Sequence, residues 1–210
     1  MQGEIPVSVG GLMNSELHLA CKRADVASFD AAMAAGFDIH VTNRDGDTPL
    51  HLACSSGFSH AVDALLGAGA DACLKNKYGV SALHMARSAV DAKALLSRGA
   101  NPNALDKSYR NALHWAAKRG SLEVVLVLVD VGCDIDAQDA SGNTPLHLAK
   151  DGLCAQALVE SGAHLLIKNA RGLTADADHR DKGHLEILLA IAKGFSTYGQ
   201  RPASSPSMSI

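Results

Sequence analysis

A short pattern of hydrophobic and polar residues recurs along this chain at a nearly fixed spacing. Its central leucine, always followed by histidine, occurs at Leu17, Leu50, Leu83, Leu113 and Leu146, so the spacings are 33, 33, 30 and 33 residues. A second landmark recurs at the similar spacings of 33, 30, 33 and 30 residues, at Gly36, Gly69, Gly99, Gly132 and Gly162. Such a period is typical of repeat proteins, in which similar units stack side by side.

Each unit carries the signals of two short helices. Thr48 and Thr144 suit the N-cap of a first helix, and the proline after each suits the first helical position, where no backbone N–H is needed. A second helix follows with one apolar face, as in Val62, Leu65 and Leu66. It ends at the recurring glycine, which suits the left-handed conformation after a helix. The order helix, helix, extended turn therefore repeats.

This motif resembles that of the ankyrin repeat family, whose 33-residue unit carries T-P-L-H-x-A. The segments Asp47–Ala53 and Asn143–Ala149 match it closely. The resemblance implies an all-α solenoid with projecting hairpin loops. We place the repeat domain at 14–194, after an N-terminal segment 1–13 and before a disordered Ser/Pro-rich tail 195–210. Its six helix-turn-helix units span approximately 14–42, 43–75, 76–105, 106–138, 139–168 and 169–194.

The third and fifth units are each three residues shorter than the others. The missing residues fall between Leu83 and Gly99 and between Leu146 and Gly162. Three residues are nearly one helical turn. We therefore expect a shortened first helix or a tighter inter-helix turn in both units, with a notch in the stack at each place.

Ten histidines raise the question of a metal or catalytic site. Five of them occupy one slot of the repeat, namely His18, His51, His84, His114 and His147. Stacked units lie about 8 to 10 Å apart, whereas zinc ligands converge to about 2 Å from one ion. These histidines are therefore predicted to be structural, bonded to the backbone of the adjacent loop. Cys21 and Cys54 also share a slot and are predicted to be small core residues, and we expect neither a metal nor a cofactor.

Composition excludes several classes of partner. The 210 residues carry a formal net charge of −3, and the pI of about 6.3 argues against a dedicated nucleic-acid binder. The longest branched-apolar run, Val124 to Val129, is far too short to cross a bilayer. Five cysteines without a C-x-x-C pair are typical of free thiols in a reducing compartment. We expect a protein of the cytoplasm, with the nucleus as the alternative, that binds neither nucleic acid nor membrane.

The sequence contains no nucleophile elbow, glycine-rich phosphate loop or metal-spaced cluster, so nothing supports an enzyme. Repeat architectures instead offer an extended surface. We expect a non-catalytic adaptor that binds a protein partner through the concave surface of loops and first helices. The alternative is a dedicated regulatory or inhibitory subunit of a single enzyme complex. Outside its complex the chain is expected to be a monomer.

The candidate partner-binding residues are the variable positions of the central units, at the loop tips and around the first helices. They are Lys77, Tyr78, Val80, Arg87, Lys107, Tyr109, Arg110, Trp115, Lys118 and Arg119. Tyrosine, tryptophan and arginine are enriched in interface hot spots, and the basic charge favours an acidic or phosphorylated partner segment.

Two of these positions have competing interpretations. Tyr109 stands where other units have glycine, which predicts a strained turn. Trp115 replaces Leu52 of the second unit and can equally be a core residue. The tyrosines and basic residues can also be ordinary solvated surface.

Overall fold

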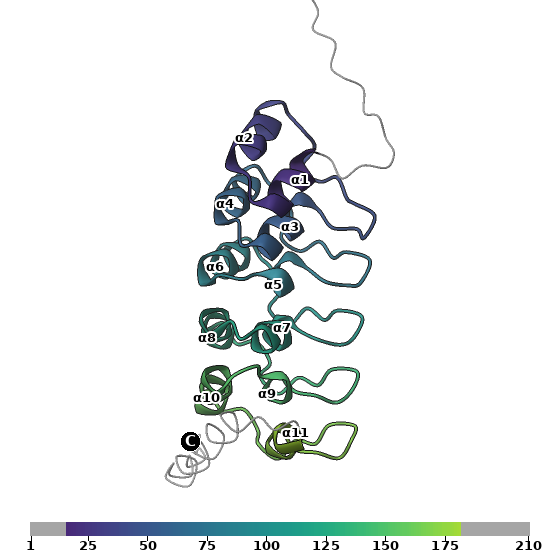
Figure 1. Ribbon diagram of the computed structural model, residues 1–210, viewed down its shortest axis with the longest axis vertical. Helices are drawn as coiled ribbons and strands as arrows, with labels where there is room; N and C mark the ends of the chain where they lie inside the picture. The colour runs from purple at the N-terminus through teal and green to yellow at the C-terminus, as the bar shows by residue number, and fades with distance from the viewer. Residues whose placement is uncertain (1–15, 182–210) are drawn as a thin grey trace, which may run out of the picture.

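The computed structural model describes residues 16–181, which form a stack of short helix pairs (Figure 1). The pairs are α1 (Glu16–Arg23) with α2 (Val26–Ala34), α3 (Pro49–Ser56) with α4 (Ser59–Gly67), α5 (Ala82–Met85) with α6 (Ala89–Ser97), α7 (Ala112–Arg119) with α8 (Leu122–Asp130), and α9 (Pro145–Leu148) with α10 (Gly152–Glu160). Helix α11 (Ala175–Asp181) follows them. The expected N-terminal segment 1–13, the second helix of the last unit and the tail 195–210 lie outside the described residues.

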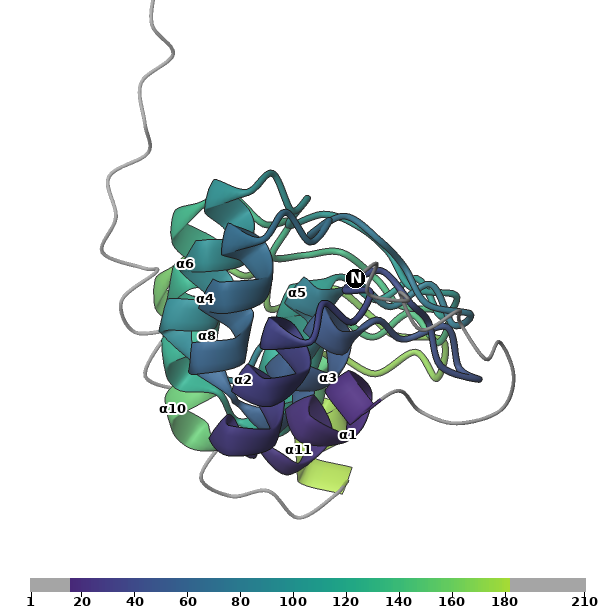
Figure 2. The ribbon, with the colours of Figure 1, turned by 90° about the horizontal axis from the view of Figure 1, so that it is seen from above.

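The helices form two columns, and the loops project to one side (Figures 1 and 2). One column holds the first helices of the pairs, α1, α3, α5, α7, α9 and α11, and the other holds the second helices. Each helix packs against its partner and against the equivalent helix of the next pair. The described residues contain no strand, only one isolated bridge between Lys75 and Ser81. The expected all-α repeat stack is confirmed.

The core is a continuous strip of small and branched side chains between the two columns. The leucine of each motif is at most 1% exposed, and the alanine three residues after it, such as Ala53 or Ala116, is also buried. Cys21 and Cys54 are completely buried, and burial raises the pKa of the Cys21 thiol to about 12. Both are small core residues, as predicted. Because each unit covers its neighbour's apolar face, no unit has a complete core of its own.

One histidine in each unit joins its first helix to the next unit. Nε2 of His51 lies 3.1 Å from the carbonyl oxygen of Val80, and Nδ1 lies 3.2 Å from the backbone nitrogen of Thr48. A carbonyl only accepts and an amide N–H only donates, so the ring is neutral with its proton on Nε2. The same Nε2 contact, at 2.9 to 3.0 Å, joins His18, His84, His114 and His147 to the carbonyl oxygens of Asp47, Arg110, Asn143 and Leu173, respectively. The prediction of structural histidines is confirmed.

The two short units have shortened first helices. Helices α5 and α9 contain four residues each, whereas α3 and α7 contain eight. The long helices end at Gly57 and Gly120 in the left-handed conformation, with φ of 74° and 78°. The short ones end at Ala86 and Ala149, where ψ of 131° and 127° turns the chain into an extended conformation. The missing three residues are therefore taken from the last turn of the first helix.

We predict that acidification destabilises the stack through these histidines. Burial lowers the pKa of His18, His51 and His114, and lowers that of His84 to about 4. Because the folded pKa lies below the unfolded value of 6.5, this contribution is complete above pH 6.5 and is lost as the pH falls from 6.5 towards 4. For His84 alone the loss is about 3 kcal/mol. Urea unfolding at several pH values in this window measures it.

The matched variant is His84→Gln, because glutamine at this helix position can still accept the N–H of Ser81 but does not titrate. Its unfolding free energy should depend less steeply on pH than that of the unchanged protein, by about one proton. Equal slopes for the two proteins would contradict the neutral, buried imidazole.

Candidate protein-binding surface

Backbone hydrogen bonds join the tips of successive loops. The N–H of Lys77 donates to the carbonyl of Asp45 at 2.9 Å, that of Lys107 to Tyr78 at 2.9 Å, and that of Ala140 to Ser108 at 2.8 Å. These bonds hold each tip at a fixed place relative to the next one. The loop side of the stack is therefore a preformed surface, which lowers the entropy lost when a partner binds.

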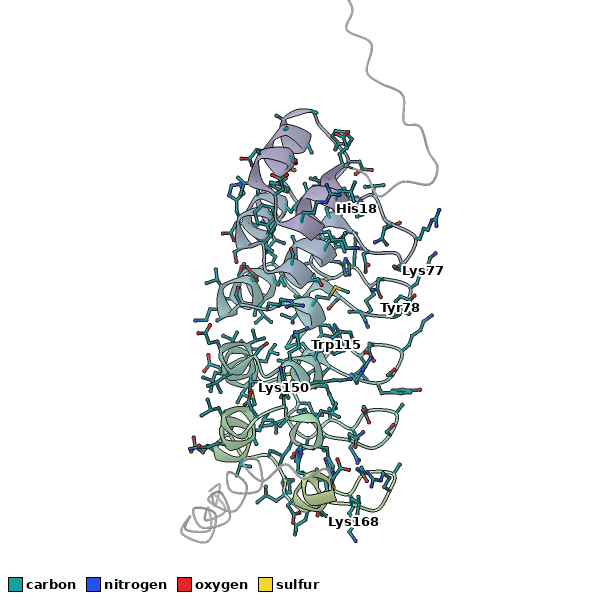
Figure 3. The ribbon with its side chains drawn as sticks, viewed as in Figure 1. His18, Lys77, Tyr78, Trp115, Lys150 and Lys168 are labelled. Carbon is teal, nitrogen blue, oxygen red and sulfur yellow. The ribbon has the colours of Figure 1, made fainter. Side chains whose placement is uncertain are left out.

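Tyr78 and Tyr109 project from adjacent tips of this surface. Their side chains are 58% and 61% exposed, and Figure 3 shows Tyr78 on its loop. The hydroxyl of Tyr78 donates to a carboxylate oxygen of Asp45 at 3.1 Å. Tyr109 has a φ of 60° at the position where Gly46 and Gly79 have 81° and 76°. The predicted strained turn is confirmed, because a side chain in the left-handed region is disfavoured.

The other candidates in the loops differ in accessibility. Lys77 and Lys107 are exposed, and Nζ of Lys77 donates to the carbonyl of Arg44 at 2.6 Å. Val80, in contrast, is only 4% exposed, and its carbonyl accepts the hydrogen bond of His51. This corrects the expectation that Val80 contacts a partner. The residue before the first helix is buried because the histidine of the preceding unit binds its carbonyl.

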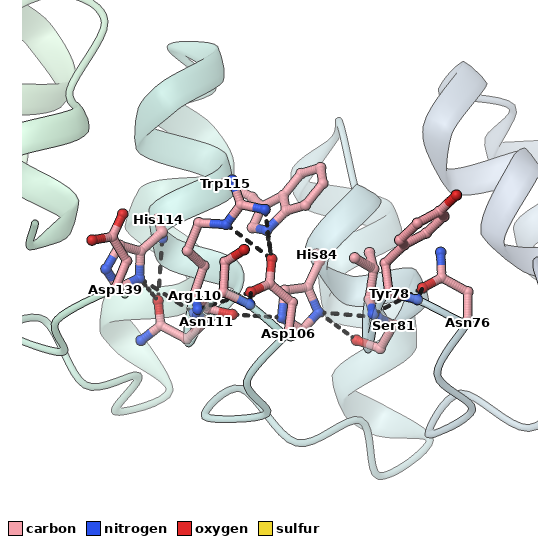
Figure 4. A network of polar contacts seen from close by, with 12 residues as sticks. Asn76, Tyr78, Ser81, His84, Asp106, Arg110, Asn111, His114, Trp115 and Asp139 are labelled. Atoms are coloured by element: carbon pink, nitrogen blue, oxygen red, sulfur yellow. Dashed lines mark hydrogen bonds and ion pairs between the residues drawn. The ribbon is translucent and has the colours of Figure 1, made fainter. Parts of the chain in front are cut away.

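Asp106 organises the base of the fourth loop (Figure 4). Its Oδ2 accepts hydrogen bonds from Nε of Arg110 at 2.9 Å and from the indole N–H of Trp115 at 3.0 Å. Its Oδ1 accepts from the backbone N–H groups of Ser108 and Arg110. Burial raises the pKa of this carboxyl, but the hydrogen bonds from Arg110, Trp115 and Ser108 outweigh it and hold the pKa below its usual value. The carboxylate therefore stays charged and fixes both side chains.

Trp115 combines the two interpretations that the sequence left open. Its side chain is partly buried, and the Arg110 guanidinium lies over the ring, 4.9 Å from the centroid. On its other neighbours it meets the edge of His84, with ring centroids 6.3 Å apart. Trp115 is thus fixed in place by the fold, and it also lines a pocket on the surface.

Arg119 fills the gap that the missing turn of α5 leaves. Its Nη2 donates to the carbonyl oxygens of His84 at 2.9 Å and Ala86 at 2.7 Å, which lie at the end of the short helix. In the second unit, Ser56 holds the equivalent position and bonds the carbonyl of Cys21 through its hydroxyl. Carbonyls at a helix end lack partners within the helix. The long arginine side chain supplies the donor where the helix is one turn too short.

A pocket of about 370 Å³ lies beside the short helix, between α3 and α7. Its lining comprises Ser55, Met85, Arg87, Arg110, His114, Trp115, Lys118 and Arg119. It therefore brings together five of the ten predicted residues. Lys77, Tyr78, Lys107 and Tyr109 lie on the loops instead, and Val80 is buried. The sequence analysis overlooked Asp106, for which the only signal is an acidic residue four positions before an arginine.

Within residues 16–181, histidine, cysteine and acidic side chains do not gather into a group of three that could hold a metal ion. None of the helices in this range is long and apolar enough to cross a membrane.

We predict that Arg119→Ala lowers the free energy of unfolding by about 1.5 to 3 kcal/mol, the range for a hydrogen bond to a charged group. The loss arises because the carbonyls of His84 and Ala86 lose their donor. Lys118→Ala is the control, since Lys118 is exposed and should change stability by less than about 0.5 kcal/mol. Urea unfolding at neutral pH compares the two. An Arg119→Ala protein as stable as the control would show that the contact is dispensable.

Comparison with known proteins agrees with this architecture. The family model described as ankyrin repeats (3 copies) matches residues 17–104 and 88–169. The chain is 32% identical over 108 residues to E3 ubiquitin-protein ligase KEG of Arabidopsis thaliana, covering 47% of the chain and 7% of the ligase. It is 43% identical over 76 residues to human Protein fem-1 homolog A, covering 34% and 11%. It is 35% identical over 94 residues to human Rabankyrin-5, covering 42% and 8%.

The chain thus spans 7 to 11% of the length of these relatives, and the likeness concerns their repeats. The family model, in contrast, covers most of the chain. Together with the recurring motif and the stacked helix pairs, this match shows that the chain belongs to the ankyrin repeat family.

Proposed function

We propose that the chain is a non-catalytic adaptor that binds a protein partner through its loop tips and first helices. Ankyrin repeats generally mediate protein–protein interactions. The observation that carries the proposal for this surface is Tyr109, a large exposed aromatic residue in a left-handed turn where the other loops use glycine. Folding gains nothing from an exposed, strained tyrosine. Partner binding is a function that offsets the cost.

The charge of this surface favours a particular class of partner. Lys77 and Lys107 extend from the same two loops as the tyrosines, and Arg87 and Lys118 are exposed near the first helices. The chain as a whole carries a net charge of −3, so these cations are locally concentrated. An acidic or phosphorylated segment would be attracted and oriented by them. We place this interaction in the cytoplasm or the nucleus, with the chain a monomer outside its complex.

The test combines Tyr78→Ala with Tyr109→Gly. Glycine relieves the left-handed strain, so Tyr109→Gly alone should raise the free energy of unfolding by about 1 kcal/mol. The double variant should nevertheless bind its partner about tenfold or more weakly, as expected when two hot-spot side chains are removed. The two changes have opposite signs, so weaker binding cannot be attributed to unfolding. Quantitative affinity capture from the source cells, followed by titration of the captured protein, measures the binding.

The matched control is Leu126→Ala with Leu153→Ala, two exposed apolar side chains on α8 and α10 in the other column. This pair should leave capture unchanged. Equal capture by the tyrosine variant and this control would reject the loop surface. The composition of the native complex separates the two roles: one enzyme in stoichiometric amount would favour a regulatory or inhibitory subunit, and several substoichiometric proteins would favour an adaptor.

A further inference from the structure

The pocket beside α5 is strongly cationic. Four of its lining side chains are basic, namely Arg87, Arg110, Lys118 and Arg119, and no lining residue is acidic. Asp106 neutralises Arg110 through a salt bridge of 2.9 Å. Among the described residues, no ion pair involves any of the other three cations. Three positive charges at the pocket thus lack a counter-charge.

These cations are close enough to disfavour one another. Burial, and secondly the charge of Arg87, lower the pKa of Arg119 to about 10. Like charges that share a site raise the free energy of the charged state, and an anion between them relieves the repulsion. Arg119 cannot move away, because its Nη2 is held by the carbonyls of His84 and Ala86.

The fold itself does not require this set of charges. In the second unit the positions equivalent to Arg110, Trp115, Lys118 and Arg119 hold Asp47, Leu52, Ser55 and Ser56. A short first helix does not require them either, since after the equally short α9 the positions of Arg110 and Trp115 hold Leu173 and Asp178. The cationic pocket is therefore a property of one place in the stack, which is expected of a binding site and not of the repeat framework.

The pocket also has an apolar wall formed by Trp115 and Met85. A small inorganic anion would use only the cations, whereas a peptide side chain with an apolar neighbour would use both parts. A phosphorylated serine or threonine carries about −1.5 to −2 charges and three acceptor oxygens, against −1 for an aspartate or glutamate. Three unneutralised cations match the phosphate better than the carboxylate.

We propose that this pocket binds a phosphoserine or phosphothreonine, flanked by apolar residues, in the partner segment. The inference deepens the proposed function and rests on it, because it assumes that this face of the stack binds a protein. The phosphate lies among Arg87, Lys118 and Arg119, and the apolar neighbour packs on Trp115. Arg110, held by Asp106, fixes the indole and so acts as a positioning residue.

The test uses the fluorescence of Trp115, the single tryptophan of the chain. The probes are two blocked heptapeptides with a central serine flanked by leucines, identical except that one serine is phosphorylated. The phosphorylated peptide should bind saturably and at least about tenfold more tightly than the other. Arg87→Gln and Lys118→Gln should each weaken its binding by about tenfold, and higher salt should weaken it further. Both side chains are exposed, and urea unfolding verifies that the variants are folded.

Lys107→Gln is the matched control, since it removes an exposed lysine of a nearby loop that does not line the pocket. It should change the affinity by less than about twofold, within the usual effect of a distant surface charge. Equal affinity for the two peptides would overturn the inference, as would an equal loss in all three variants. Tighter binding of a short single-stranded oligonucleotide would assign the pocket to nucleic acid, and equally tight inorganic phosphate would exclude a role for the peptide.

Failure of this inference is distinguishable from failure of the proposed function. If the phosphopeptide does not bind but the tyrosine variant still loses its partner, the adaptor role stands and the phosphate pocket is rejected. If the tyrosine variant also keeps its partner, the whole face is rejected.

Discussion

The hydrogen bond from a buried imidazole to the carbonyl group of the next unit sets the geometry of this molecule. In each case the accepting residue directly precedes the N-cap of the next first helix, as Val80 precedes Ser81. One bond therefore fixes both the distance between two units and the point where the next helix begins. It also withdraws that residue from the surface, so recognition is left to the loop tips and to the exposed sides of the first helices.

Much of this could be predicted from the sequence, because repetition compares each position with its equivalents. Five histidines in one slot indicate one structural role, and units of 30 residues indicate a lost helical turn. Tyr109 in a glycine slot indicates a left-handed turn before any coordinates are known. In each case the inference depends on local backbone geometry or on the period, both of which the sequence contains.

The rest depends on contacts between residues of different units, which the sequence does not specify. The missing turn was foreseeable, but not that Arg119 of the following unit would reach His84 and Ala86, 35 and 33 residues earlier. Likewise, the choice between core and surface for Trp115 is decided by Asp106, which binds the indole and the Arg110 guanidinium together. The pocket arises only because both effects occur around one short helix.

The central claim is that the five repeat histidines are neutral, with the proton held on Nε2 by the neighbouring unit. Nitrogen-15 NMR of the imidazole rings at pH 7 tests it most directly, since the two ring nitrogens have distinct shifts when one tautomer is fixed. The account predicts a protonated Nε2 and an unprotonated Nδ1 for His18, His51, His84, His114 and His147. Averaged shifts, as in a freely exchanging surface histidine, or a proton on Nδ1 would contradict it.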